Sequence, residues 1–349
     1  MSDESEVLIR VEGRAGRITL NRPQALHALT TAMCREMIAA LTAWREDPAV
    51  ELVLIDHSGE RGFCAGGDIR TLAESARGDG LANHEFFYVE YQLDHLLFHY
   101  PKHTVAIMDG VVMGGGVGIS RPCRFRVGTE RTTFAMPETG IGLFPDVGGS
   151  WYLSRMPDHI GRWLALTGAR LKAADCELVG VITDYVPAAD LAELKARIVA
   201  DPASVETALT EFEAEAGRPP IAAHQDEIAR CCSGGTVEAV VASLAAGGEW
   251  AREQAEIVRT KSPLSTKVAF RQMRDGAAAG SFTEVMAMEY RIAHRLAVSG
   301  DFLEGVRAVI LDKDNQPKWD PPALEAVSET MVDAIFAALP SNLEWSPLP

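Results

Sequence analysis

Features of secreted or membrane-bound chains are scarce in this sequence. Its 349 residues contain six cysteines, none in a C-x-x-C pair, and the adjacent Cys231 and Cys232 cannot build an ordinary disulfide framework. The longest apolar run, residues 104–120, is rich in glycine and broken by Asp109, which argues against a membrane span. The acidic start MSDESEVLIR lacks the basic and then apolar order of a targeting peptide. We therefore expect a cytoplasmic protein in a reducing compartment.

Basic residues are also in the minority. The chain has 33 Lys and Arg against 49 Asp and Glu, a formal charge of −16. Nucleic acid and anionic membranes are recognised by clustered basic surfaces, so neither is expected as a partner. A small anionic ligand is still allowed, because a few cations and backbone N–H groups can hold it. The His, Asp and Glu residues do not show metal-ligand spacing, and no metal site is expected.

The order of apolar patterns predicts an α/β core followed by helices. Residues 7–11 and 17–20 read as a hairpin around a Gly-rich turn, and residues 51–56 and 103–109 read as buried strands. Intervening helical patterns predict crossover connections. After about residue 188 only helices are expected, at 189–216, 221–232, 236–260, 263–275 and 281–298. The predicted division is a core over 1–188 that holds the ligand site and a helical region over 189–349 that packs on it.

Two glycine-rich turns stand where a predicted strand ends and a helix begins. They are SGERGFCAGGDIR (58–70) and GVVMGGGVGIS (110–120). Neither satisfies G-x-G-x-x-G, and G-x-x-x-x-G-K-[ST] is absent, so nucleotide-binding fingerprints are not met. One free N–H from residues 65–67 and one from residues 114–116 would form a two-donor oxyanion hole. The alternative is that the glycines only permit tight turns and close packing.

A third stretch, MPETGIGLFPDVGG (136–149), sets two acids among glycine, proline and apolar residues. Glu138 and Asp146 lie eight positions apart. A carboxylate can be a nucleophile, or a general base when burial raises its pKa. Helix capping is the alternative for each acid. There is no G-x-S-x-G nucleophile motif, and Cys64 with His57 upstream is better explained as a small buried cysteine than as a Cys/His catalytic pair.

These three stretches, together with NRPQALHAL (21–29) and LTGARLKAADCELVGVITDYV (166–186), resemble the enoyl-CoA hydratase/isomerase (crotonase) superfamily. The resemblance implies an α/β fold, a crotonase-like spiral of ββα turns with a C-terminal helical region. It also implies an acyl-CoA substrate whose thioester carbonyl is held by the N–H groups of Ala65 and Gly115. By the same motif positions, further contacts to the substrate are expected from Glu90, Gly66, Gly67, Asp68 and Gly114.

The acids narrow the resemblance to hydrolysis. Hydratases of the superfamily carry two catalytic glutamates, and here one of those positions is Gly118 while the other is Glu138. Asp146 stands where hydratases usually have glycine, as in members that hydrolyse short 3-hydroxyacyl-CoA thioesters in valine breakdown. The implied substrate is 3-hydroxyisobutyryl-CoA or the related 3-hydroxypropionyl-CoA, and no cofactor is expected because coenzyme A is part of the substrate. Glu138 would attack the thioester or activate water. Asp146 would orient the 3-hydroxyl of the substrate or the water, and would help to protonate the departing thiolate.

Two other functions compete with this interpretation. An enoyl-CoA isomerase or hydratase would use Glu138 alone to move a proton beside an enolate. A noncatalytic acyl-CoA-binding protein would keep the cavity without turnover. Superfamily members commonly form trimers, so a homo-oligomer is an expected arrangement, although the additional helices could cover that surface.

Overall fold

The computed structural model describes residues 5–349, and its strands form two sheets. The larger sheet has the order β1-β2-β3-β5-β7-β10 and the smaller one β4-β6-β8-β9. The first four residues of the acidic start discussed above lie outside the described residues. The strands are β1 (Val7–Glu12), β2 (Ala15–Leu20), β3 (Leu52–His57), β4 (Gly62–Cys64), β5 (His103–Met108), β6 (Val111–Met113), β7 (Phe125–Gly128), β8 (Thr133–Ala135), β9 (Leu171–Lys172) and β10 (Asp184–Tyr185).

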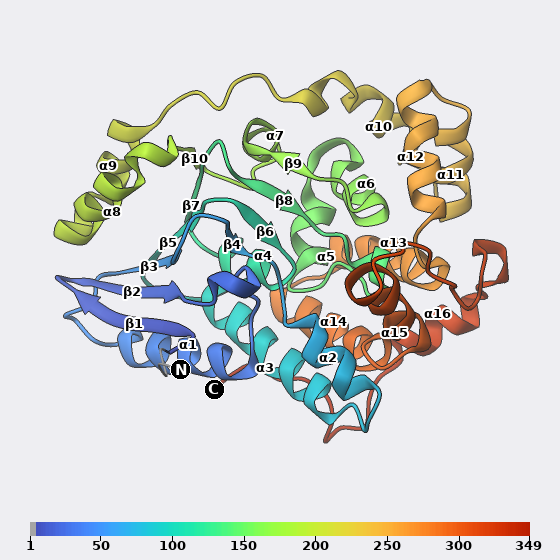
Figure 1. The fold of residues 1–349 in the computed structure, drawn as a ribbon, viewed down its shortest axis with the longest axis horizontal. Coiled ribbons are helices and arrows are strands. Elements are labelled where there is room, and N and C mark those ends of the chain that lie inside the picture. The colour runs from blue at the N-terminus through green and yellow to red at the C-terminus, as the bar shows by residue number, and fades with distance from the viewer. Residues whose placement is uncertain (1–4) are drawn as a thin grey trace.

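Both sheets grow by the same repeated step, which confirms the expected spiral. β1 and β2 pair antiparallel as the predicted hairpin, and β2, β3, β5, β7 and β10 then pair in parallel. In three successive turns, β3 and β4, β5 and β6, and β7 and β8, the chain adds one strand to the large sheet and one to the small sheet before helices return it (Figure 1). The glycine-rich turns follow the small-sheet strands β4 and β6, so the parallel pairing of these strands brings the turns to the same edge.

The helices are more finely divided than the sequence pattern predicts. The expected helix at 236–260 is broken at Gly247 and Gly248, and the one at 189–216 is broken at Pro202, because neither residue type continues a helix well. The α-helices are α1 (Thr31–Arg45), α2 (Ile69–Ala76), α3 (Leu81–Phe98), α4 (Gly115–Ser120), α5 (Gly149–Tyr152), α6 (Ile160–Thr167), α7 (Ala173–Leu178), α8 (Leu191–Ala200), α9 (Val205–Phe212), α10 (Gln225–Cys231), α11 (Val237–Ala245), α12 (Glu249–Arg259), α13 (Pro263–Ala278), α14 (Phe282–Leu296), α15 (Gly300–Val306) and α16 (Glu329–Phe336).

The large sheet is buried on both faces, which explains the uninterrupted apolar run of β3. Val53 and Ile55 point into the main core with α1 and α3, whereas Leu52 and Leu54 point into a second core with α8 and α9. Alternate residues of one strand face opposite sides of a sheet, so a strand covered on both faces has no polar stripe. The two cores together fix the sheet between helices of both regions.

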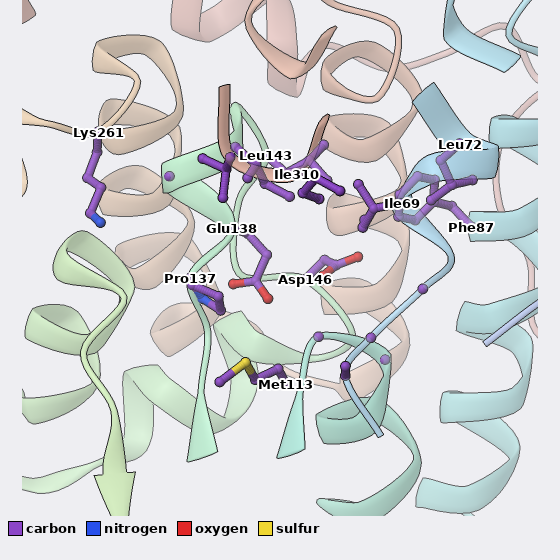
Figure 2. A pocket seen from close by; sticks show the side chains of 18 of the residues that line it. Ile69, Leu72, Phe87, Met113, Pro137, Glu138, Leu143, Asp146, Lys261 and Ile310 are labelled. Atoms are coloured by element: carbon purple, nitrogen blue, oxygen red, sulfur yellow. The ribbon is translucent and has the colours of Figure 1, made fainter. Parts of the chain in front are cut away.

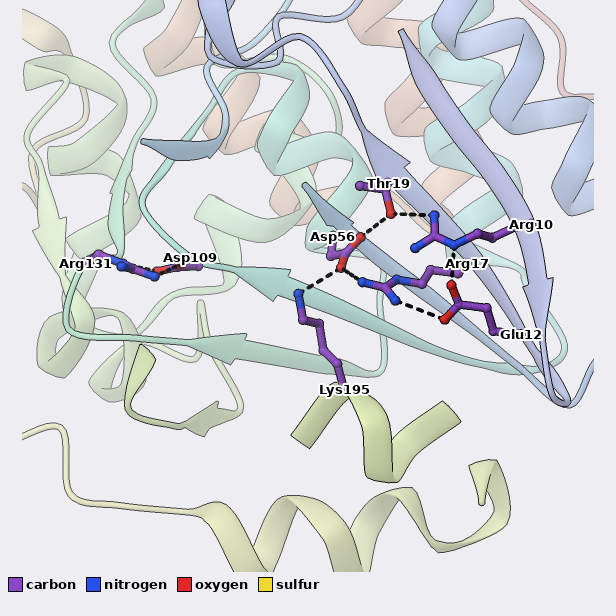
Figure 3. A network of polar contacts seen from close by, with 8 residues as sticks. All are labelled: Arg10, Glu12, Arg17, Thr19, Asp56, Asp109, Arg131 and Lys195. Carbon is purple, nitrogen blue, oxygen red and sulfur yellow. Dashed lines mark hydrogen bonds and ion pairs between the residues drawn. The ribbon is translucent and has the colours of Figure 1, made fainter. Parts of the chain in front are cut away.

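The helical region packs directly on the α/β core. α14 lies against α3, and the main core cluster extends from Val7 to Trp345. On the other side of the molecule, α8 is tied to the sheet by Lys195, whose Nζ lies 3.1 Å from the buried Asp56 carboxylate (Figure 3). Arg17 Nη2 binds the same oxygen at 2.7 Å. Among residues 5–349, no helix is long and apolar enough to cross a membrane.

Candidate active site

A partly enclosed cavity lies where the two glycine-rich turns and the acid-bearing loop meet (Figure 2). Its volume is about 430 Å³. Of the residues predicted to form the site, Asp68 alone does not line it. The site is expected within residues 1–188, but the cavity extends beyond that range because the helical region supplies part of its wall. Those additional lining residues are Thr260, Lys261, Val309, Ile310, Asn315 and Pro317.

The two glycine-rich turns approach each other closely. Gly66 has φ +111° and Gly114 has φ +46°, conformations that are strained for residues with a side chain. A Cβ on Gly114 would lie 3.1 Å from the Cα of Gly66, and one on Gly66 would lie 3.5 Å from the Cα of Gly114. Glycine is therefore favoured at both positions by the backbone angle, and at Gly114 also by the limited space between the turns.

The backbone hydrogen bonds of the first turn correct one expectation. The Ala65 N–H donates to the carbonyl of Leu26 at 3.0 Å, so it is not free for a ligand. Gly67 lies opposite Leu29 in an isolated parallel β-bridge. The two hydrogen bonds of the bridge use the neighbours of Gly67: the Gly66 carbonyl accepts from the Leu29 N–H, and the Asp68 N–H donates to the Leu29 carbonyl. In such a bridge the N–H of the central residue points away from the partner strand.

Free backbone donors are therefore found beside Ala65 rather than at it. Among the described residues no acceptor is present for the N–H of Gly66 or Gly67. The Gly115 N–H belongs to the first residue of α4, where a helix offers it no acceptor. Gly67 and Gly115 both line the cavity. The donor predicted at Ala65 is therefore replaced by a neighbour in the same turn, because the register of that turn against residues 26–29 is set by the fold.

Glu138 and Asp146 project into the same part of the cavity (Figure 2). Glu138 begins a 3-10 turn (Glu138–Ile141), and its Oε2 is buried with no hydrogen-bond partner within residues 5–349. Burial, and then the nearby Asp146 charge, raise the pKa of Glu138 well above its usual range. Burial raises the pKa of Asp146 to about 7. Neither side chain caps a helix, so the capping alternative does not apply.

Two further acids from α3 stand behind the glycine turns. Glu90 lines the cavity, as predicted. Its Oε1 lies so close to the Cα of Gly115 that a side chain at position 115 would clash with it. Asp94, one helical turn further along, was not predicted, and its carboxylate fills the space beside Gly118, 2.6 Å from where a Cβ would be. Burial raises the pKa of both acids well above the usual range. The spacing of four on one buried helix face was the available signal for Asp94.

Two other candidate residues are engaged elsewhere. Asp68 caps α2 by accepting from the Thr71 N–H and pairs with Arg22 at 3.0 Å, which explains why it does not line the cavity. The Cys64 thiol donates to the carbonyl of His27 at 3.2 Å, and burial raises its pKa to about 12. A thiol held in this way is a poor nucleophile, consistent with the buried-cysteine interpretation.

Comparison with known proteins identifies the family of this chain. Residues 15–336 match the enoyl-CoA hydratase/isomerase family, and the chain belongs to this crotonase-type family. Curated relatives named mitochondrial 3-hydroxyisobutyryl-CoA hydrolase include proteins from Danio rerio, 46% identical over 96% of this chain and 90% of the relative, and from Homo sapiens, 41% identical over 97% and 90%.

Solved structures extend the agreement to the fold. A structure described as a carnitinyl-CoA dehydratase from Mycobacterium thermoresistibile has a TM-score of 0.93 at 40% identity, covering 98% of this chain and 99% of that one. A structure described as an enoyl-CoA hydratase from Rhodobacter sphaeroides has a TM-score of 0.90 at 41% identity, covering 98% and 100%. The fold expected from the motif resemblance is thus confirmed.

Proposed function

We propose that this chain is an acyl-CoA thioester hydrolase that cleaves 3-hydroxyisobutyryl-CoA, or the related 3-hydroxypropionyl-CoA, to coenzyme A and the free hydroxy acid, as in valine breakdown. The observation that carries the proposal is the placement of Glu138 and Asp146 in one cavity with the free amide groups. The names and identities of the curated relatives support the same substrate class.

The first chemical step needs a polarised carbonyl. The N–H groups of Gly67 and Gly115 would accept the charge that develops on the thioester oxygen, and each such donor is worth about 10² to 10³ in rate. Glu138 then either attacks the carbonyl carbon, giving a mixed anhydride and the thiolate of coenzyme A, or takes a proton from a water that attacks it. In the first route water hydrolyses the anhydride and regenerates the carboxylate.

Asp146 is suited to donate the proton that the departing thiolate needs. With a pKa of about 7, its carboxyl is partly protonated near neutral pH and can protonate the departing thiolate. It could instead orient the 3-hydroxyl of the acyl group, a role that also needs a polar side chain at this place. No cofactor takes part in either scheme, because coenzyme A enters as part of the substrate.

The cations at the cavity would bind the phosphates of coenzyme A. Lys261 and Arg170 both line the cavity, and neither forms an ion pair within residues 5–349. Figure 2 shows Lys261 extending from the helical region on the side of Pro137. Glu90 and the glycines at 66 and 114 would contact the acyl group and thioester. Arg22, by contrast, is already paired with Glu6 and Asp68.

The competing functions have less support. A hydratase would need a second acid at Gly118, where the Asp94 carboxylate already occupies the adjacent space. An isomerase or a noncatalytic binding protein would have no use for Asp146. A cytoplasmic location stays a prediction, because the curated relatives are named mitochondrial. A homo-oligomer likewise stays a prediction.

The test is Glu138→Gln with 3-hydroxyisobutyryl-CoA as substrate. Release of coenzyme A, followed with a thiol reagent, should fall by at least about 10³-fold, because the carboxylate that attacks or activates water is removed. Binding of the acyl-CoA should change little. Glu177→Gln, an exposed acid of α7, is the control. Retained thioester cleavage in the Glu138 variant, or a double-bond change without coenzyme A release in the wild type, would overturn the proposal.

A further inference from the structure

The loop that carries Asp146 has an unusual backbone immediately after the acid. Val147 has φ +54° and Gly148 has φ +83°, two consecutive left-handed residues. For a β-branched residue such as valine this conformation is strained and persists only where surrounding contacts impose it. The direction of the Asp146 side chain depends on this turn, so the contacts that impose it also place the carboxylate.

Those contacts come from the helical region. Glu289 on α14 accepts the Gly148 N–H at 2.7 Å through Oε2 and the Ser150 N–H at 2.9 Å through Oε1. The Ser150 hydroxyl donates to the same Oε1. Glu289 is fully buried, on a helix face that is otherwise mainly apolar. A buried acid is costly unless its oxygens are satisfied, and here every partner lies shortly after Asp146, at Gly148 and in the first turn of α5.

A second residue holds the loop on the other side of the acid. Gln272 on α13 is fully buried, and its Nε2 donates to the carbonyl of Pro145, directly before Asp146. Hydrogen bonds from α13 and α14 therefore hold this segment at residues 145, 148 and 150, although the two helices lie more than 120 residues further along the chain. Asp146 is the one titratable side chain between these anchors.

We infer that Glu289 and Gln272 are positioning residues that hold Asp146 in its reactive orientation, so that the helical region completes the active site of the core. This inference rests on the proposed role of Asp146. It assigns to α13 and α14 a function in turnover that is separate from their contribution to the fold, because their contacts to the loop flank the acid on both sides.

The test compares Glu289→Gln with a matched variant away from the loop. The amide cannot accept both N–H groups and the hydroxyl as the acid does, so kcat for coenzyme A release should fall about 10- to 100-fold with KM unchanged. Gln254→Met is the control: Gln254 is a buried amide of α12 that accepts the Trp163 indole N–H at 2.9 Å, with no contact to the loop. It should lose stability with no change in kcat.

A double-mutant cycle with Asp146→Asn separates the positioning role of Glu289 from the proposed role of Asp146 itself. If Glu289 acts through Asp146, the double variant is no slower than Asp146→Asn alone. Multiplicative losses, or a Glu289→Gln enzyme as fast as Gln254→Met, would overturn the inference while leaving the proposed function intact. Wild-type turnover by Asp146→Asn would instead overturn the proposed role of Asp146. If Glu289→Gln does not fold, Ser150→Ala and Gln272→Met make the same comparison. The first removes the hydroxyl bond to Glu289, and the second removes the bond to the Pro145 carbonyl.

Discussion

The hydroxyl of Tyr91 donates a hydrogen bond of 2.9 Å to Oδ2 of Asp146, across 55 positions of sequence. Tyr91 is fully buried on α3, one residue after Glu90. This bond favours the ionised carboxylate and so partly offsets the increase in pKa that burial causes at Asp146. The tyrosine thereby adjusts the protonation of an acid proposed to deliver a proton.

Tyr91→Phe should raise the pKa of Asp146 above about 7, because the charged form loses its donor. If protonated Asp146 assists the departing thiolate, activity declines as pH rises through this pKa, and the variant should keep activity to higher pH. A lost hydrogen bond of about 1 kcal/mol corresponds to a shift of somewhat under one pH unit. The measurement is the pH profile of coenzyme A release. Tyr88→Phe, which removes an exposed hydroxyl contact to Ser346, is the control. An alkaline limb that does not move would contradict the prediction.

Gly66→Ala should impair turnover beyond its cost in stability. An alanine is strained at φ +111°, so the first turn relaxes to another backbone conformation and its N–H groups no longer converge with that of Gly115. We expect kcat to fall about 10²-fold, the effect of losing one donor. Gly180→Ala is the matched control, since Gly180 also has a positive φ (+69°) but no atom within 4 Å of an added Cβ. Equal kcat values for the two variants would count against the paired-turn site.

Lys261→Ala should weaken substrate binding and spare the chemistry. Its ammonium faces the cavity, and burial lowers its pKa, which favours an anionic ligand as its partner. Loss of one phosphate contact should raise KM about tenfold with kcat unchanged, a free-energy difference of about 1.4 kcal/mol. Arg259→Ala, two residues earlier and paired with Glu256 on the surface, is the comparison. A KM increase that disappears when the acyl group is carried by a thiol without phosphates would assign the contact.

Asp94→Asn should make the protein's stability less sensitive to pH. Burial raises the pKa of Asp94 in the folded state, so its favourable contribution is complete below the unfolded pKa and is lost as pH rises through the folded pKa. The free energy of unfolding of the variant, relative to that of the wild type, should therefore increase from pH 5 to pH 8. The increase should be at most about 1.4 kcal/mol per pH unit. Denaturant midpoints at both pH values measure this.

Asp314→Asn is the control for that comparison. A hydrogen bond from Arg307 lowers the pKa of Asp314, so its contribution is lost only at acid pH and should be constant from pH 5 to 8. A pH dependence of unfolding that is the same in the Asp94 variant and the wild type would show that Asp94 does not titrate differently in the folded protein.

The parts of the site that sequence could predict are those written in contiguous motifs. The two glycine turns, Glu138 and Asp146 are each recognisable from a few neighbouring residues, and the hairpin and crossover strands follow from local apolar patterns. The donor within the first turn was misassigned at Ala65, because its hydrogen bond to Leu26 depends on a register between segments almost forty residues apart.

The residues that were missed act across long sequence separations. Glu289 leaves one signal, an acid on the buried face of α14 among Val285, Met286 and Ile292, but the sequence does not say which N–H groups it meets. Gln272 and Lys261 leave no comparable signal, because amides and lysines are common on helix surfaces and at helix ends. Only the folded chain shows that they reach the cavity and the Asp146 loop.

Because six lining residues come from beyond position 188, the cavity has no independent existence in the N-terminal portion. A fragment ending there would expose the apolar underside of α3 and leave the 145–150 segment without its anchors. A shortened version of this enzyme would therefore have to retain residues 260–317, which include α13 and α14, and also α8 and α9, which cover the apolar far face of the large sheet.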